Sequence, residues 1–286
     1  MHTVDKQERI RCADCIEHQS LSEMRQRRAP SHITNLPQHA RNPVPWMVIF
    51  LFATLAWIPT LQQTLSMLSM PMSMVGPMGM SLGIFLLFWT IMMIAMMFPA
   101  LAPTASVRFE TRRQQTHSAM ACSSLLLFLV GYLLIWTVFG LPVFFLSLLN
   151  EHLILHTPPL GIGLDIALLA GIGLYQMTPL EKRFLSCCNP TLGCHTEMPS
   201  PNLTLSHLKT GLMHGIHCLG ACGGLMLVMV IVGFMNLPWM VLLTLVIFVE
   251  KTWSYGDRLS FLMGIGFILV AMLAFIDPAV LSSFSL

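Results

Sequence analysis

Charged residues are scarce in this sequence. Asp, Glu, Lys and Arg make up only 10% of its 286 residues, whereas 55% are hydrophobic, and the mean hydropathy is +0.71. A water-soluble globular protein of this length would carry more charge on its surface. The net charge of +2 also provides no strongly basic face, so we expect no nucleic-acid partner.

Two kinds of motif are also missing. The sequence has no glycine-rich nucleotide-binding motif, so any transport would be passive or driven by a partner. The first 43 residues lack the early apolar core of a cleavable signal peptide. They are polar and contain seven of the Lys and Arg residues. We interpret residues 1–43 as a disordered basic arm in the cytosol and residues 44–286 as a transmembrane helical domain.

Long apolar runs dominate the rest of the chain. Runs of this length cross a lipid bilayer as helices, which predicts an all-α, polytopic transmembrane bundle of about seven spans. The spans are expected at about 44–61, 81–103, 121–149, 160–178, 209–235, 237–250 and 259–276. The sixth is short, so spans five and six have a re-entrant hairpin as an alternative. We expect prolines to kink or end three helices, at Pro59, Pro99 and Pro142.

The positions of the basic residues predict the orientation. With the amino terminus in the cytosol, all fifteen Lys and Arg residues fall on the cytosolic side or at its membrane edge. This agrees with the positive-inside rule. The carboxyl terminus is then expected on the opposite side. The eight cysteines would lie in the cytosol or within the membrane, where reduced thiols are usual.

Two imidazoles and two thiols interrupt the fifth predicted span. At about 100° per residue they share an arc of roughly 140° on one side of a helix, and side chains of this kind rarely lie in lipid without a function. The residues are His214, His217, Cys218 and Cys222. Mixed soft ligands favour Cu(I) first and Zn(II) second. The alternative is that the cysteines only pack helices and the histidines lie at the interface.

Small residues flank this arc on both sides. Gly211 and Gly215 form one small-xxx-small pair, and Gly220 and Gly224 form another, so we expect neighbouring helices to approach closely here. Ligands at i, i+4 and i+8 are spread over about 12 Å of one helix. Neighbouring elements must therefore complete any metal site.

Methionines are concentrated in two places. A loop between spans one and two, facing away from the cytosol, contains six of them: Met67, Met70, Met72, Met74, Met78 and Met80. Thioethers bind Cu(I), which predicts a capture loop; the alternative is a loop that inserts into lipid headgroups. Span two contains two i,i+4 pairs, which either continue a thioether path or fill the core: Met92, Met93, Met96 and Met97.

Other metal-ligand candidates lie outside these groups. A cytosolic loop after span four has three thiols and an imidazole, although not with the spacing of a standard zinc site: Cys187, Cys188, Cys194 and His195. Cys12 and Cys15 form a C-x2-C pair in the arm, which is either a docking site for a metal ion or incidental. Asp165 begins span four and is either functional or interfacial.

Several of these motifs occur in an order that resembles a known family over roughly residues 80–270. The resemblance is carried by His214–Cys222, Tyr175–Leu180, Val232–Leu237, Glu250-Lys251 and Met92–Pro99. The family consists of bacterial, predicted metal-binding integral membrane proteins, a domain of unknown function sometimes labelled copper-associated. The resemblance implies membrane location, here the bacterial inner (cytoplasmic) membrane, and metal binding. It does not supply a reaction.

Matching motif positions imply a metal-site role for Cys188, His214, Cys218, Cys222 and the Met92–Met97 group. The chain departs from the family pattern at Glu181, where a basic residue is frequent, at Phe184, where a cysteine is frequent, and at Gly223, where an aromatic residue is frequent. As a hypothesis, His217 and Cys187 compensate for the cysteine that Phe184 replaces.

These observations give three hypotheses for the function. The first is a membrane protein that handles copper by capture, transfer or transport, with a metal donor or acceptor protein as partner. The second is a thiol redox or cofactor-assembly protein using Cys218 and Cys222, although thiols one helical turn apart do not bridge without distortion. The third is a structural subunit of a membrane complex. The sequence does not identify an enzymatic reaction.

Overall fold

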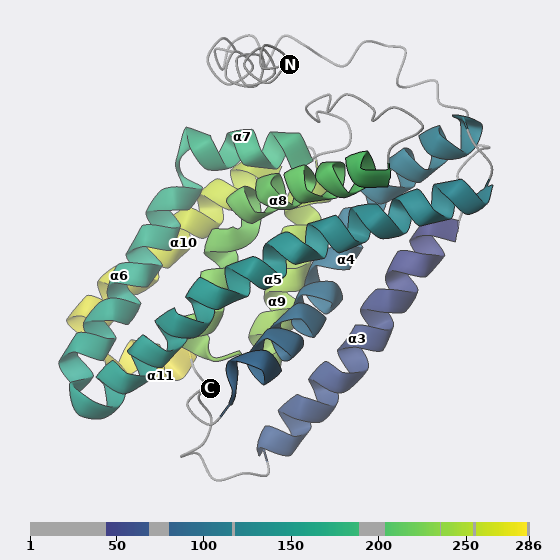
Figure 1. Cartoon of the computed structure of the whole chain (residues 1–286). Coiled ribbons are helices and arrows are strands. Elements are labelled where there is room, and N and C mark those ends of the chain that lie inside the picture. The colour runs from purple at the N-terminus through teal and green to yellow at the C-terminus, as the bar shows by residue number, and fades with distance from the viewer. Residues whose placement is uncertain are drawn as a thin grey trace, which may run out of the picture. The chain divides into compact units, whose positions relative to one another are not determined.

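The structure is a computed structural model that describes residues 44–68, 80–115, 118–188, 204–234, 236–253 and 256–284. All of these residues belong to one compact unit, Asn42–Leu286. Within the described ranges the regular structure is entirely helical, without strands. The predicted all-α class is therefore confirmed (Figure 1).

Each of the seven predicted apolar runs is a helix. The described helices are α3 (Val44–Leu68), α4 (Leu82–Gln115), α5 (Ser118–His156), α6 (Pro158–Gln176), α7 (Pro179–Cys188), α8 (Thr204–Val232), α9 (Leu237–Thr252), α10 (Gly256–Ile276) and α11 (Ala279–Phe284). Among the described residues, six of these helices are long and apolar enough to cross a membrane: α3, α4, α5, α6, α8 and α10. The helix of the sixth predicted span, α9, has 16 residues, slightly fewer than a usual crossing.

The prolines expected to kink or end helices end none of them. Pro59, Pro99 and Pro142 all lie inside continuous helices. Pro179 does not simply close the preceding helix, because α6 already ends at Gln176 and Pro179 begins α7. A proline suits the first helical position, where its missing N–H leaves no hydrogen bond unmade.

The turn between α8 and α9 has a clear local cause. Gly233 has φ +94°, a left-handed conformation that favours glycine and ends α8. Asn236 then caps α9, because its side-chain oxygen accepts a hydrogen bond from the Trp239 backbone N–H at 3.3 Å. The two helices are therefore separate elements joined by a short turn.

The helix α8 lies at the centre of the described unit. It packs most extensively against α5 and also contacts α6, α7 and α9, whereas α3 packs against α4 at the periphery (Figure 1). A Cβ atom on Gly211 would overlap the Phe128 carbonyl oxygen of α5, and one on Gly220 would lie 2.5 Å from the Phe184 ring of α7. The expected close packing on both sides of the ligand arc is confirmed.

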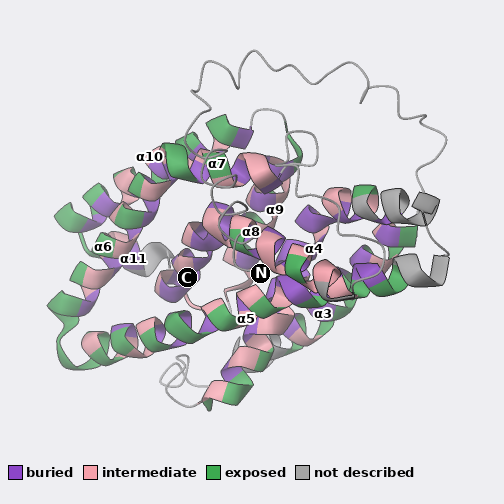
Figure 2. Cartoon of the chain, turned by 45° about the horizontal axis from the view of Figure 1, so that its top comes forward, coloured by how far each residue is buried: buried purple, intermediate pink, exposed green. Residues whose placement is uncertain are grey.

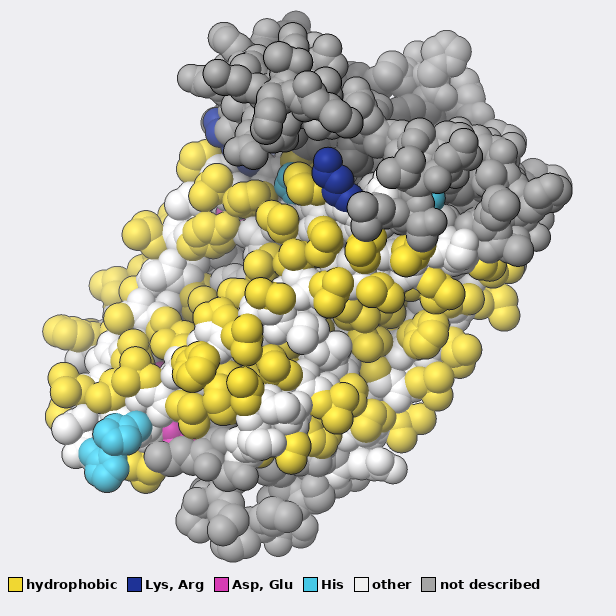
Figure 3. All heavy atoms as spheres, viewed as in Figure 1, with side chains coloured by type: hydrophobic (Ala, Val, Ile, Leu, Met, Phe, Trp, Pro, Cys, Tyr) yellow, Lys and Arg dark blue, Asp and Glu magenta, His cyan; other side chains and the backbone are white. Residues whose placement is uncertain are grey.

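The outer surface of the bundle is apolar. Large hydrophobic side chains are exposed along α3, α4, α5, α6, α9 and α10, and Figure 2 shows that buried faces of the helices alternate with exposed ones. Figure 3 shows this apolar surface between an end that carries basic side chains and an opposite end that carries histidines. Lipid tails are the environment in which such a surface is stable.

Candidate metal centre

Three cysteine thiols meet where α7 packs against α8. Cys188 ends α7, and Cys218 and Cys222 lie one turn apart on α8; all three are buried and free. The Cys218 thiol lies close enough to those of Cys188 and Cys222 to interact with both. The structure thus brings together a thiol from the predicted cytosolic loop and two from the fifth predicted span.

Two further side chains contact the central sulfur. The Lys251 Nζ of α9 donates a hydrogen bond to Cys218 Sγ at 2.8 Å, and Tyr132 Oη of α5 lies 3.0 Å from the same sulfur. Lys251 is only 4% exposed. A buried ammonium group is costly unless a negative charge compensates it. The Cys218 sulfur is surrounded by hydrogen-bond donors, and as a thiolate it would supply the negative charge that Lys251 needs.

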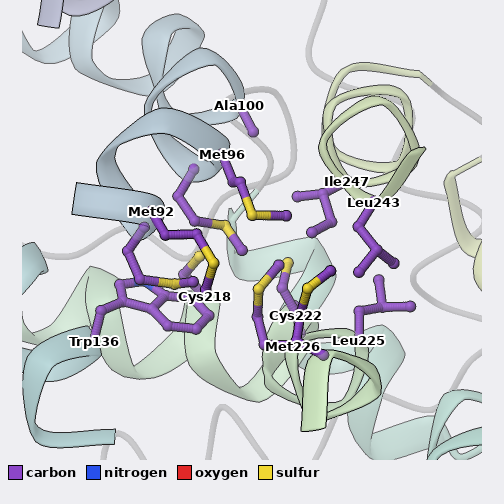
Figure 4. Close-up of a cluster of buried hydrophobic side chains, with 14 of the residues drawn as sticks. Met92, Met96, Ala100, Trp136, Cys218, Cys222, Leu225, Met226, Leu243 and Ile247 are labelled. Atoms are coloured by element: carbon purple, nitrogen blue, oxygen red, sulfur yellow. The ribbon is translucent and has the colours of Figure 1, made fainter. Parts of the chain in front are cut away.

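Methionine sulfurs extend this cluster towards α4. All four predicted methionines of span two are buried in the core: Met92, Met93, Met96 and Met97. Figure 4 shows Met92 and Met96 gathered with Cys218 and Cys222 in one group of buried side chains. Thioethers and thiolates are both soft ligands. The two halves of the expected soft-ligand set are therefore neighbours in the fold.

The histidines of α8 have other partners. The His217 Nδ1 lies 2.7 Å from the Met213 carbonyl oxygen, and its ring contacts that of Phe184 at 6.1 Å. The buried His214 ring lies beside those of Phe128 and Tyr132, at 5.6 and 6.0 Å. In the described part of the chain, no three His, Cys, Asp or Glu side chains are arranged to hold one metal ion. Within the described residues, the soft donors that gather at this cluster are thiols and thioethers.

The remaining candidates lie elsewhere. Asp165 is buried in α6 and accepts a hydrogen bond from Asn150 Nδ2 of α5 at 2.9 Å. Cys187 in α7 is disulfide-bonded, so the expectation of a reduced thiol is wrong at this position, and Cys187 offers no free thiol to compensate for Phe184. Met80, before α4, is half-buried, and Met67 lies in α3 without a described side chain. The candidates outside the described residues are Cys12, Cys15, Met70, Met72, Met74, Met78, Cys194 and His195.

Sequence reasoning missed two members of the cluster. The sequence places Lys251 at the membrane edge and in a family motif but not beside a thiol, although a lysine directly after an apolar run can fold back into the bundle. Tyr132 was not considered. It is one of only three tyrosines in the chain and lies within an apolar run, where its hydroxyl needs a partner. Both positions are visible in the sequence, but neither shows that the side chain contacts Cys218.

Comparison with protein families gives one match. The sequence model of the PpoB2 family, described as a copper chaperone, matches residues 86–274. This range includes the three thiols, Lys251, Tyr132 and the α4 methionines. Searches among curated proteins and solved structures gave no match. Since the match covers well over half of the chain, the protein belongs to the PpoB2 copper chaperone family.

Proposed function

We propose that this protein is an integral membrane copper chaperone that binds Cu(I) as cargo within its helical bundle. Cys218 and Cys222 supply the thiolates, with Cys188 as an alternative thiolate ligand. Met92 and Met96 supply thioethers from α4. The observation that carries the proposal is the contact between Lys251 Nζ and Cys218 Sγ, beside two more buried thiols.

Charge balance explains why a lysine would lie in this cluster. Cu(I) held by two thiolates has a net charge of −1, which is costly to bury alone. The adjacent Lys251 ammonium makes the loaded group neutral. In the absence of copper the same ammonium neutralises the Cys218 thiolate. The lysine therefore supports both states of a carrier that must bind its cargo and release it.

The ligand chemistry supports Cu(I) over Zn(II) as the cargo. Structural zinc sites use four N or S ligands, whereas this cluster combines thiols with the thioethers of α4. Thiolates together with thioethers select Cu(I). The cluster is buried, which also limits oxidation and exchange with water.

The apolar surface and the six long helices support residence in a membrane, and we assign the chain to the bacterial inner membrane with its amino terminus in the cytosol. The methionine-rich segment would then face the opposite compartment and deliver copper inward along α4. A copper donor or acceptor protein completes the cycle, because a chaperone transfers its cargo by ligand exchange.

Copper binding by the purified protein tests the proposal directly. The full chain in detergent is loaded anaerobically with Cu(I), desalted and analysed for copper per protein. We expect bound copper in the wild type and loss of it in a Cys218→Ser/Cys222→Ser variant. Cys122→Ser is the matched control, since Cys122 is a free but exposed cysteine on α5, and it should retain all of the copper.

Two results would contradict this function. Equal copper content in the wild type and the double variant would remove Cys218 and Cys222 from the site. A mixed disulfide trapped through Cys218, in a protein that binds no copper, would instead support the thiol redox hypothesis. Thermal unfolding of each variant shows whether a loss of copper follows from misfolding.

A further inference from the structure

Two buried acids and a serine lie beside the sulfur cluster. Glu181 of α7, Glu250 of α9 and Ser260 of α10 are 0%, 2% and 1% exposed. Neither carboxyl group nor the Ser260 hydroxyl has a well-formed hydrogen bond in the described part of the chain. Buried polar atoms are almost always paired. Five such oxygens from three helices indicate a ligand that the protein atoms alone do not provide.

The three side chains face one another. Ser260 Oγ is close enough to interact with both carboxyl groups, and the two carboxyl groups interact electrostatically with each other. The start of α10 lies close to Glu250, because a Cβ on Gly256 would overlap the Glu250 carbonyl oxygen. The three side chains therefore form one group. We call Glu181 and Glu250 the acid pair, and Ser260 lies beside them.

Two lysines act electrostatically on the acid pair, and each has another partner. The Lys251 ammonium is hydrogen-bonded to Cys218. The Lys182 ammonium attracts Glu181 weakly, but it lies over the Phe261 ring, 5.7 Å from its centre. The titratable groups that act on the pair from the surrounding helices are Tyr175, Lys182, Cys188, Cys222, Lys251 and Asp257.

Two carboxylates this close in apolar surroundings cannot both be ionised, because burial and mutual repulsion favour protonation. Burial raises the pKa of Glu181 to about 7. A proton shared by the two groups pairs one oxygen of each and leaves a single negative charge. Near neutral pH the pair can therefore accept one more proton.

Copper loading releases a proton close to this pair. Metal binding to a thiol displaces its proton. If Lys251 already holds Cys218 as a thiolate, the second ligand, Cys222, must lose its proton when Cu(I) arrives. Glu250 is near enough to act electrostatically on both Cys188 and Cys222.

We propose that Glu181 and Glu250 are the proton acceptor for copper loading: they take the Cys222 thiol proton when Cu(I) binds and return it when Cu(I) leaves. This inference rests on the proposed function. The exchange is balanced, since Cu(I), Cys222–SH and a Glu carboxylate become Cys222–S–Cu and a Glu carboxylic acid. No electron is transferred.

The exchange also reduces the buried charge. Before loading, Lys251 and the Cys218 thiolate cancel, and the singly protonated acid pair has a charge of −1. After loading, Lys251 cancels the copper bis-thiolate, and the doubly protonated pair is neutral. The arrival of Cu(I) thus removes an uncompensated charge from the protein interior, which favours loading.

Proton release during loading tests this role. Cu(I), supplied as its acetonitrile complex, is added anaerobically to the full chain in weakly buffered detergent at pH 7 with an indicator dye. The wild type should release fewer protons to the solvent than the Glu181→Gln and Glu250→Gln variants, by about one proton per bound copper. Asp277→Asn removes an exposed acid just after α10 and should match the wild type.

Each outcome has a distinct meaning. Normal copper binding with equal proton release in the wild type and both Gln variants would overturn the acid-pair inference alone. Absence of copper binding by the wild type would overturn the proposed function. Tight Mn²⁺ binding by the wild type that both Gln variants lose would assign the pair to a hard cation instead of a proton. An infrared band of protonated carboxyl groups that grows on loading, and is absent from the double Gln variant, would support the proton.

Discussion

The Lys251 ammonium of α9 donates a hydrogen bond to the Cys218 sulfur of α8 across 2.8 Å, inside the helical bundle. The two residues are 33 positions apart in the sequence and meet because α9 turns back beside α8 after Gly233. This contact links a permanent positive charge to the sulfur that is central to the thiol cluster.

Replacing Lys251 with Met should weaken Cu(I) binding by about 10–100-fold, the usual effect of removing a partner behind a metal ligand. Methionine keeps most of the side-chain volume but leaves the copper bis-thiolate without a counter-charge. Competition with a coloured Cu(I) chelator measures the affinity. Lys182→Met is the control, since Lys182 lies over an aromatic ring; equal losses in both variants would refute a specific role for Lys251.

Tyr132→Phe should have a smaller effect. The variant removes the hydroxyl that contacts Cys218 at 3.0 Å but keeps the ring in the core, so the expected loss is on the order of 1 kcal/mol in Cu(I) binding. The same chelator competition measures it. A loss as large as that of the Lys251 variant would mean that the tyrosine is itself a ligand.

Met92→Leu/Met96→Leu should separate ligation from packing. Leucine has a similar volume, so the free energy of unfolding should change by less than about 1.5 kcal/mol. The Cu(I) affinity should fall, because two thioether ligands are lost. Thermal unfolding and copper competition are measured on the same preparation. Met229→Leu, a buried methionine two turns beyond Cys222 on α8, should leave the affinity unchanged. Unchanged affinity in the double variant would assign the α4 methionines to packing.

Much of this site could be predicted from the sequence, but not which residues of other helices complete it. The spacing of Cys218 and Cys222 is a local property of one helix, so their shared face was correctly expected. The same helical arc included His217, yet in the structure this ring turns to the Met213 carbonyl oxygen and Phe184. The meeting of Lys251 with Cys218 depends on how α9 packs, and periodicity within one helix does not determine that.

The acid pair illustrates the same limit. Glu181 was noticed only as a departure from a family pattern at the start of a predicted cytosolic segment. In the structure, Glu181 belongs to the short helix α7, which packs against the bundle. The buried face of α7 consists of Glu181, Leu185 and Cys188. A ten-residue amphipathic segment after a proline is a weak signal beside the long apolar runs.

Gly211→Val should destabilise the bundle without touching a ligand. Its side chain would overlap the Phe128 backbone of α5, and such overpacking costs about 1–3 kcal/mol. Gly171→Ala is the matched control, because nothing lies within 4 Å of a Cβ at that position. Thermal unfolding in detergent should show a lower midpoint for the first variant only. Equal midpoints would mean that α5 and α8 can separate freely here.

Stability should fall as the pH rises from about 4.5 to 7. The folded protein holds the Glu181 proton up to a pKa of about 7 because the group is buried, whereas the ordinary value is 4.5. The folded state therefore binds more protons than the unfolded state in this window, and the stabilisation, roughly 3 kcal/mol at most, is lost as the proton leaves. Unfolding midpoints measured across this range should decline less in Glu181→Gln. A parallel decline in both proteins would rule out Glu181 as the cause.

The short helix α7 presents Glu181 and Cys188 on one buried face, about two turns apart. A rigid element of this size cannot shift one of these side chains and leave the other in place. A movement of α7 would therefore displace Cys188, the alternative thiolate ligand, together with Glu181 of the acid pair. Under the proposed function, release of the metal and return of the proton would then be coupled through this one helix.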